Sequence, residues 1–225
     1  MLTTSSAKIY LADQRGFTKS NNHQSFHTFN FGSYVNEHRQ PFSSLQALND
    51  EILVASKSIT YTLSRPTEII IFPLVGHCLC SVRGVTTKID VGEIFKCSLD
   101  EADAIELTNP FKEELINYLY IELSSRQTSL NATTNGFEIE SQLNHLHKIM
   151  TSYCANFYLG IYDGREEAIL SYEEDKQFFV YVIEGAFEVN KRLLHRRDSL
   201  ALWDTHELEF EALSNQAIIL VVELH

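Results

Sequence analysis

Two stretches of this chain share a pattern that restricts its fold more than any other feature of the sequence. The stretch "IIIFPLVGHCLCSV", residues 69–82, is an apolar run that ends at Gly76 and is followed by an alternating run. The stretch "FFVYVIEGAFEVNK", residues 178–191, repeats this order around Gly185. A repeat separated by about half the chain is a whole domain rather than a solenoid unit. The sequence therefore predicts two duplicated β-barrels.

The rest of the chain supports an all-β fold. Short apolar segments bounded by turn residues recur throughout, and long helical periodicity is nearly absent. Many short strands joined by turns are typical of antiparallel sandwiches and barrels. The polar stretch at residues 126–144 is rich in Ser, Thr and Asn, which predicts a linker. We therefore predict two domains, residues 1–125 and 126–225.

Charge and cysteine content exclude several classes of partner. The chain has 18 Lys and Arg against 30 Asp and Glu, a formal net charge of −12, which repels phosphate backbones and argues against nucleic acid. The longest apolar runs are too short to span a bilayer, and the first residues lack the apolar core of a secretory signal. Four cysteines in such a chain predict reduced thiols and a cytoplasmic protein. No oligomeric state is indicated by the pattern.

Three short motifs of the first half and one stretch of the second half occur in a familiar order. They are "HTFNF" (His27 to Phe31), "PFSSL" (Pro41 to Leu45), "NDE" (Asn49 to Glu51) and "DSLALWDTHELEFEA" (Asp198 to Ala212). In these motifs the chain resembles the pirin-like family over nearly its whole length. The resemblance implies a bicupin, with two cupin barrels in tandem, in which the first residues can cross from one barrel to the other. It also implies a structural role for His27, which would hold a loop over the first barrel.

The resemblance identifies the stretch at residues 58–76 as the place where iron-binding pirins carry two histidines. In those relatives a His-x-His pair lies on one strand, and side chains two residues apart on a strand point to the same face. Alignment on Glu68 and Gly76 places Thr62 and Ser64 at the two histidine positions. Hydroxyl groups are weak neutral ligands, so these two residues do not replace imidazoles.

The other two ligand positions of the family, a histidine and a glutamate, fall on a later strand. Alignment on Gly92 and Glu93 places Ile105 at the histidine position and Leu107 at the glutamate position. Aliphatic side chains are not metal ligands. We therefore expect a first barrel that holds no metal and no other cofactor.

Strand parity predicts the lining of a pocket in the first barrel. Its residues would be Thr62, Ser64, Glu68, Ile70, Ile105 and Leu107. This lining is small, mostly neutral and partly apolar. It suits either a filled core or a weakly polar organic ligand, and it does not suit a cation.

Cys78 and Cys80 are the remaining candidate site. Both thiols fall on one face of a predicted strand. Buried cysteines often serve only as small apolar side chains, whereas a redox role requires a lowered pKa, which no neighbouring residue in the sequence provides. Both interpretations stay open.

Three functions are compatible with these patterns. The first is a metal-free pirin-like protein, non-enzymatic, whose first barrel binds a small organic molecule, regulates a partner or is vestigial. The second, implied by the resemblance alone, is a quercetin 2,3-dioxygenase-like activity with iron. The third is a thiol-based redox responder that uses Cys78, Cys80 or Cys97.

Overall fold

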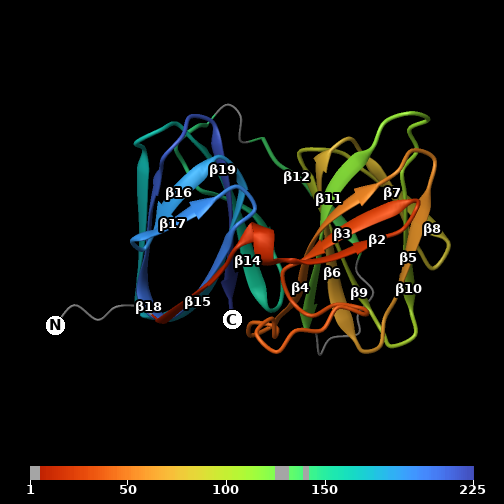
Figure 1. Ribbon diagram of the computed structural model, residues 1–225, viewed down its shortest axis with the longest axis horizontal. Helices are drawn as coiled ribbons and strands as arrows, with labels where there is room; N and C mark the ends of the chain where they lie inside the picture. Colours follow the sequence, from red (N-terminus) through yellow and green to blue (C-terminus); the bar gives the residue numbers. More distant parts are fainter. Residues whose placement is uncertain (1–5, 125–131, 139–141) are drawn as a thin grey trace. The chain divides into compact units, whose positions relative to one another are not determined.

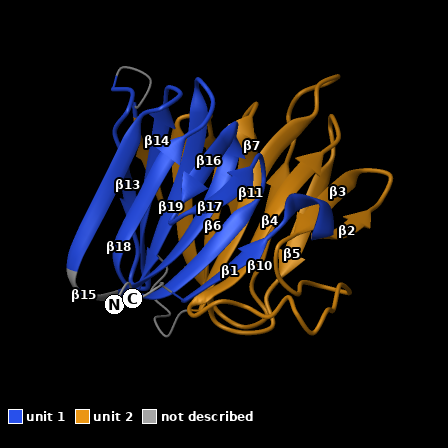
Figure 2. Cartoon of the chain, turned by 60° about the vertical axis from the view of Figure 1, so that its left-hand side comes forward, with its two compact units in different colours: residues 1–14, 138–225 blue, residues 15–137 orange. Residues whose placement is uncertain are grey.

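The computed structural model describes residues 6–124, 132–138 and 142–225, which form two compact units. One unit, residues 15–137, is called the first barrel below. The other joins residues 1–14 to residues 138–225 and is called the second barrel (Figure 2). Each unit consists of antiparallel strands, which confirms the predicted all-β tandem of cupin barrels. The only helical segment among the described residues is the 3-10 turn η1 (Ala12–Gln14).

The units divide the chain differently from the predicted domains, 1–125 and 126–225. The N-terminal strand belongs to the second barrel because β1 (Ser6–Tyr10) pairs with β18 (Ser199–Ala212). The predicted linker also contains a strand of the first barrel, since β12 (Thr133–Gly136) pairs with β9 (Glu93–Leu99). Its residues 126–131 and 139–141 lie outside the described part of the chain.

The first barrel is built from a four-stranded sheet of order β5-β10-β7-β8 and a seven-stranded sheet of order β12-β9-β6-β11-β4-β3-β2 (Figure 1). Its other strands are β2 (Gly16–Lys19), β3 (His23–His27), β4 (Leu45–Leu53), β5 (Ser58–Thr62), β6 (Thr67–Val75), β7 (Cys78–Val82), β8 (Val85–Ile89), β10 (Ala104–Thr108) and β11 (Ile116–Ser124). The apolar run of β6 lies between β9 and β11, where both of its faces are buried. A continuous apolar run is what such a central strand requires.

The second barrel contains one eight-stranded sheet of order β13-β14-β19-β15-β18-β16-β17, with β1 added on β18. Its other strands are β13 (His147–Thr151), β14 (Ala155–Tyr162), β15 (Glu167–Glu184), β16 (Ala186–Val189), β17 (Arg192–His195) and β19 (Ala217–Leu224). Aromatic side chains, among them Tyr162, Phe187 and Phe210, fill its core with edge-on ring contacts.

The two glycines of the sequence repeat occupy the same turn in the two barrels. Gly76 follows β6 with a φ of +73°, and Gly185 follows β15 with a φ of +79°. A Cβ at Gly76 would lie 2.8 Å from Ile116, and one at Gly185 would lie 2.8 Å from the Cβ of Ala217. Both turns need a left-handed residue without a side chain, so the repeat read from the sequence is a repeat of structure.

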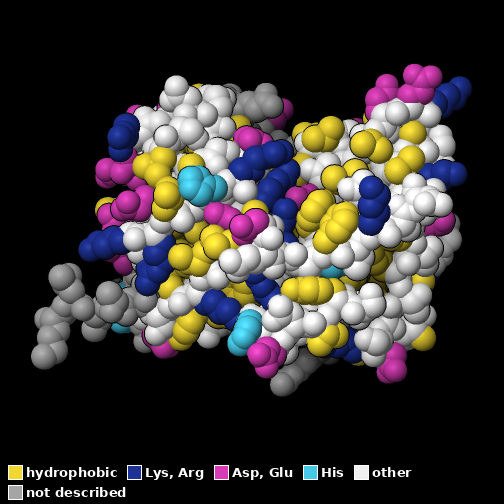
Figure 3. Space-filling model, in the orientation of Figure 1, with side chains coloured by type: hydrophobic (Ala, Val, Ile, Leu, Met, Phe, Trp, Pro, Cys, Tyr) yellow, Lys and Arg dark blue, Asp and Glu magenta, His cyan; other side chains and the backbone are white. Residues whose placement is uncertain are grey.

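The surface carries no continuous apolar belt on the face shown in Figure 3, where charged side chains of both signs are interspersed with hydrophobic ones on each unit. Within the described residues, no helix combines the length and hydropathy needed to cross a bilayer.

Candidate functional site

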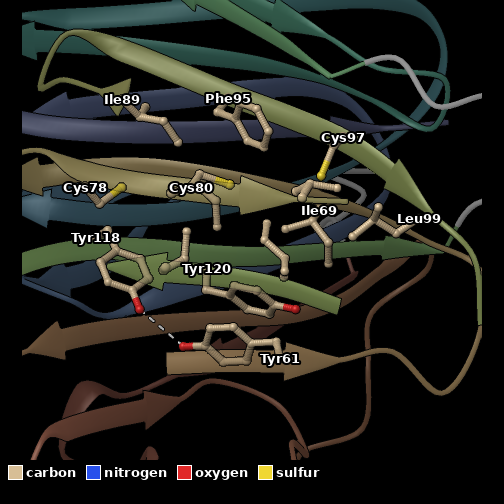
Figure 4. Close-up of a cluster of buried hydrophobic side chains, with 14 of the residues drawn as sticks. Tyr61, Ile69, Cys78, Cys80, Ile89, Phe95, Cys97, Leu99, Tyr118 and Tyr120 are labelled. Atoms are coloured by element: carbon tan, nitrogen blue, oxygen red, sulfur yellow. Dashed lines mark hydrogen bonds between the residues drawn. The ribbon is translucent and has the colours of Figure 1, made fainter. Parts of the chain in front are cut away.

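The interior of the first barrel is filled around three tyrosines. Tyr61 of β5 stacks on Tyr120 of β11, with ring centroids 4.2 Å apart, and its hydroxyl lies 3.3 Å from the hydroxyl of Tyr118 (Figure 4). All three rings are buried, and burial raises the pKa of each phenol well above its ordinary value. These side chains therefore act as neutral packing and hydrogen-bonding groups.

The residues predicted at the family's metal positions are divided between two places. Ile105 and Leu107 are fully buried in the same cluster as the tyrosines. Thr62 and Ser64 are exposed instead, because the side chains of this segment that face the cluster are Tyr61 and Leu63. The strand parity assumed for Thr62 and Ser64 is thus corrected by one residue.

The same correction applies to the predicted pocket residues of β6. The cluster takes Ile69 and Ile71 from this strand. Glu68 and Ile70 alternate with them and lie on the opposite face, where both are buried. They do not line the interior of the first barrel with Ile105.

The cluster does not fit a divalent metal. Ile105 lies directly opposite Tyr61, and Leu107 lies opposite Ile59, in the antiparallel pairing of β10 with β5. One protonated phenol and three aliphatic side chains offer none of the imidazole or carboxylate ligands that iron requires. Among the described residues, no group of three or more His, Cys, Asp or Glu side chains is placed to hold a metal ion.

A cleft of about 620 Å³ opens beside Tyr61 and contains the exposed Thr62 and Ser64. Tyr120 donates a hydrogen bond of 2.9 Å to Oε1 of Glu122 at its base. Burial raises the pKa of the Glu122 carboxyl, while this hydrogen bond and Arg65 oppose the shift. The lining, called the cleft below, consists of Asn30, Phe31, Gly32, Gln40, Pro41, Gln46, Thr60, Tyr61, Thr62, Leu63, Ser64, Arg65, Thr67 and Glu122.

A second and smaller cavity, of about 230 Å³, shares Phe31, Gly32 and Tyr61 with the lining of the cleft. It is called the seam pocket below because residues of β3 and β4 meet residues of β5 there. Its lining consists of Thr18, His23, Ser25, His27, Phe31, Gly32, Ser33, Glu51, Ile59 and Tyr61. The sequence reasoning missed this pocket, although the alternation of His23, Ser25 and His27 on one strand face was a signal for it.

A fully buried carboxylate forms the floor of the seam pocket. The side chain of Glu51 accepts a hydrogen bond of 2.8 Å from Ser25, and its Oε2 lies 2.6 Å from Nε2 of His23. These two atoms are both buried, and among the described residues neither has a regular hydrogen bond, so each is the other's nearest polar contact. The hydrogen bond from Ser25 and this close contact with His23 are the local compensation for burying the carboxylate.

His27 is linked to the same network through Ser25, whose hydroxyl lies 3.2 Å from Nδ1 of His27. Its Nε2 lies 3.0 Å from the hydroxyl of Thr18, and its Nδ1 lies 3.1 Å from Oδ1 of Asn49. The amide oxygen can only accept, so Nδ1 carries the proton and Thr18 donates to Nε2. Burial lowers the pKa of His27, and the hydrogen bond to Asn49 only partly offsets this effect. His27 thus contacts strand residues and lines the seam pocket, whereas the expected role was to hold a loop over the first barrel.

The candidate redox cysteines are deeply buried. Cys78 and Cys80 are each 1% exposed and point into the cluster with Cys97 (Figure 4). Burial raises the pKa of Cys78 to about 12 and that of Cys80 further. Thiolate formation, on which thiol redox chemistry depends, is therefore disfavoured at these positions.

Comparison with known proteins agrees with this architecture. Residues 148–224 match the family described as the quercetinase C-terminal cupin domain. A quercetin 2,3-dioxygenase of Escherichia coli (strain K12) is 20% identical, with 94% of this chain and 97% of that protein covered.

Solved structures show the same fold. YhhW from Escherichia coli has a TM-score of 0.87 at 17% identity, with 98% of each chain covered. The bacterial pirin YhhW in complex with nickel(II) has a TM-score of 0.83 at 18% identity, with 97% of this chain and 99% of that chain covered. The chain thus has the fold of these pirin structures, and its residues 148–224 are similar to the quercetinase C-terminal cupin domain.

Proposed function

We propose that the first barrel of this pirin-like protein holds no catalytic metal and binds a small hydroxylated aromatic molecule without oxidising it. The pair of Tyr61 and Ile105 carries the proposal, because these residues face each other on the two strands from which iron-binding pirins take their ligands. A neutral phenol and an aliphatic chain do not bind Fe(II) tightly. The barrel then serves binding or regulation rather than oxygen chemistry.

The cleft supports the binding part of the proposal. Its volume of about 620 Å³ is within the ~300–1,000 Å³ of small-molecule sites. The rings of Phe31 and Tyr61 offer apolar contact, and the hydroxyls of Thr62 and Ser64 offer hydrogen bonds to a ligand. A flat ring system with hydroxyl groups satisfies both kinds of surface.

The two other functions have less support. Quercetin 2,3-dioxygenase activity is suggested by the names of the Escherichia coli relatives, but it depends on metal ligands at positions where this barrel has Tyr61, Ile105 and Leu107. Redox sensing would require reactive thiolates at Cys78 and Cys80, whose pKa values are raised by burial. We also propose a cytoplasmic location, which the four free cysteines support.

Metal analysis of the purified protein tests the first part of the proposal. The protein is produced in medium supplemented with iron, nickel and manganese, and Escherichia coli YhhW is purified in parallel as a metal-binding control. We expect less than about 0.1 equivalent of any transition metal in this chain and a stoichiometric amount in the control. About one equivalent of bound metal in this chain would overturn the proposal.

Quercetin is the probe for the second part. We expect saturable quenching of protein fluorescence by quercetin, with no oxygen consumption before or after addition of Fe(II). Ser64→Trp fills the cleft and should weaken binding at least ~10-fold, whereas Val91→Trp, at an exposed position outside the cleft, should leave it unchanged. Iron-dependent oxygen uptake with quercetin would instead establish the dioxygenase alternative.

A further inference from the structure

We propose that the seam pocket is a metal-independent acid–base site for a small neutral hydroxycarbonyl compound, with His23 as the proton-transferring residue and Glu51 as the residue that positions it. The seam pocket is a different cavity from the cleft. The reaction proposed for it needs no metal ion held by the three buried tyrosines. It extends the proposed function by giving the metal-free barrel an activity of its own.

The contact between His23 and Glu51 has the form required of an acid–base pair. Nε2 of His23 faces the buried carboxylate at 2.6 Å, while Ser25 holds the other carboxylate oxygen at 2.8 Å. With Nε2 committed to Glu51, Nδ1 is the ring atom left to accept or release a proton. No hydrogen bond to Nδ1 is formed by any residue within the described ranges. A carboxylate on one imidazole nitrogen fixes the tautomer and the orientation of the ring.

The position of the pair favours exchange with a ligand rather than a purely internal role. The side chain of Glu51 is fully buried, whereas that of His23 keeps 13% of its surface exposed and lines the cavity. The ring of Tyr61 stands edge-on to His23, with the ring centroids 6.5 Å apart. The imidazole thus connects a buried carboxylate to an open cavity.

The lining of the pocket defines the class of ligand. It contains no Lys or Arg, and it includes the carboxylate of Glu51, so an anionic phosphate or carboxylate ligand has no counter-charge. The hydroxyls of Thr18 and Ser33 can bind oxygen atoms of a ligand. The volume of about 230 Å³ lies below the usual range for drug-sized ligands. A neutral molecule of a few carbon atoms that bears hydroxyl and carbonyl groups meets these conditions.

The reaction at this site is a proton transfer from the carbon next to the carbonyl. Nδ1 of neutral His23 takes the α-proton, and the C–H electron pair forms the C=C bond of an enediolate while the carbonyl oxygen becomes negative. The resulting imidazolium is stabilised by Glu51 and returns a proton to the same carbon or to its neighbour. No oxidant, reductant or metal enters the balance.

Deuterium exchange into dihydroxyacetone tests the site with a defined probe. The protein is incubated in D2O with excess EDTA, and loss of the methylene signal is followed by ¹H NMR. We expect exchange at least ~100-fold above buffer, in the range that general acid–base catalysis contributes. His23→Gln should abolish it, and His38→Gln, which removes a side chain that is 81% exposed, should not change it.

The role of Glu51 has its own readout. In ¹⁵N-histidine-labelled protein, neutral His23 should be the Nε2–H tautomer, and Glu51→Gln should shift the tautomer equilibrium towards Nδ1–H and lower the exchange rate. The groups that face His23 in this measurement are Glu51, Ser25, Tyr61 and His27. A merely structural carboxylate would alter stability without moving that tautomer equilibrium.

A second variant, Ser33→Trp, tests the seam pocket without changing His23 or Glu51, so the test does not depend on the folding of His23→Gln. Ser33→Trp fills the pocket from an exposed loop position without touching the pair, and it should also suppress exchange. Exchange at the buffer rate in the wild-type protein, or equal rates in wild type and His23→Gln, would overturn the inference. Exchange that EDTA abolishes would instead contradict the metal-free barrel, so the two proposals fail by different observations.

Discussion

The two barrels share a scaffold but have different interiors. The core of the second barrel consists of aliphatic and aromatic side chains, and its polar exception is the hydroxyl of Tyr162, which is buried without a hydrogen-bond partner. The first barrel combines its apolar cluster with a polar stripe that runs along β3 and β4 and includes His23, Ser25, His27 and Glu51. All of these are on the barrel side of their strands, so the stripe is a feature of the interior.

We infer from this difference that the first barrel is the one adapted for binding or catalysis. The second barrel also buries carboxylates, since Glu223 is 4% exposed and Asp198 is 5% exposed. Glu223 accepts hydrogen bonds from Tyr158 and Asn156 and lies 3.5 Å from Lys176, so its charge is compensated by internal donors and a lysine. In the first barrel the buried carboxylate of Glu51 instead lies against an imidazole that lines a cavity, and a role in binding or catalysis explains that difference.

Thiol labelling gives the largest expected contrast between the barrels. At pH 8, Cys97 of the first barrel, whose pKa burial raises to about 12 from an ordinary value near 9, should have about 1,000-fold less thiolate than an ordinary cysteine. Iodoacetamide should therefore label the partly exposed Cys154 of the second barrel first, as measured by peptide mass spectrometry. In urea all four cysteines should react alike. Rapid native labelling of Cys78 or Cys80 would revive the redox hypothesis.

Removal of an aromatic side chain from the core of the second barrel should strongly lower the stability of that unit. Phe210→Ala deletes a ring that packs on Tyr162 and Phe187 and should lower the free energy of unfolding of that unit by about 3–5 kcal/mol. Urea denaturation monitored at Trp203, the single tryptophan, reports on this unit. Tyr153→Ala, at a position 67% exposed, is the matched control and should change stability by less than ~0.5 kcal/mol. A loss below about 1 kcal/mol for Phe210→Ala would mean that this core is not tightly packed.

A double-mutant cycle measures what the polar stripe contributes to stability. Glu51→Leu should cost about 3 kcal/mol, because it leaves the buried Nε2 of His23 and the hydroxyl of Ser25 without their partner. The double variant His23→Leu with Glu51→Leu should recover most of this loss, since an apolar pair makes the first barrel resemble the second. Urea unfolding of the four proteins gives the coupling energy. If the double variant lost the sum of the single effects, the coupling energy would be zero and the two side chains would not act as a pair.

The fold was more predictable from the sequence than the site. The duplicated strand–glycine–strand pattern at Gly76 and Gly185 reflects backbone requirements that only a glycine meets, so it survives in the sequence as a readable signal. The prediction that the side chains of Thr62 and Ser64 point into the barrel was wrong. An alignment fixes a residue's position along the strand, whereas the face on which its side chain lies depends on how the strand pairs with its neighbours. Here Tyr61 pairs with Ile105, and Tyr61 faces the interior. The contact of His23 with Glu51 joins neighbouring strands, and no local pattern specifies which side chains meet there.

The smallest expected difference between the two barrels is in their loss of stability on acidification. The first barrel should lose stability at a higher pH than the second. The pKa of His27 is lowered in the folded protein, chiefly by burial, so below its unfolded value of about 6.5 the unfolded chain binds more protons than the folded one. The stabilisation associated with neutral His27 is therefore complete above pH 6.5 and is lost as the pH falls through the folded pKa. The slope cannot exceed about 1.4 kcal/mol per pH unit for this one proton.

Hydrogen exchange at pH 5 and pH 8 locates this effect. Peptides from β3 and β4 should lose protection on acidification before peptides from β18, because the described core of the second barrel contains no histidine. His27→Gln should flatten the pH dependence of β3 and β4, whereas the exposed His38→Gln should leave it unchanged. Equal acid lability of the two barrels, or an unchanged profile in His27→Gln, would show that the imidazole of His27 does not carry the difference.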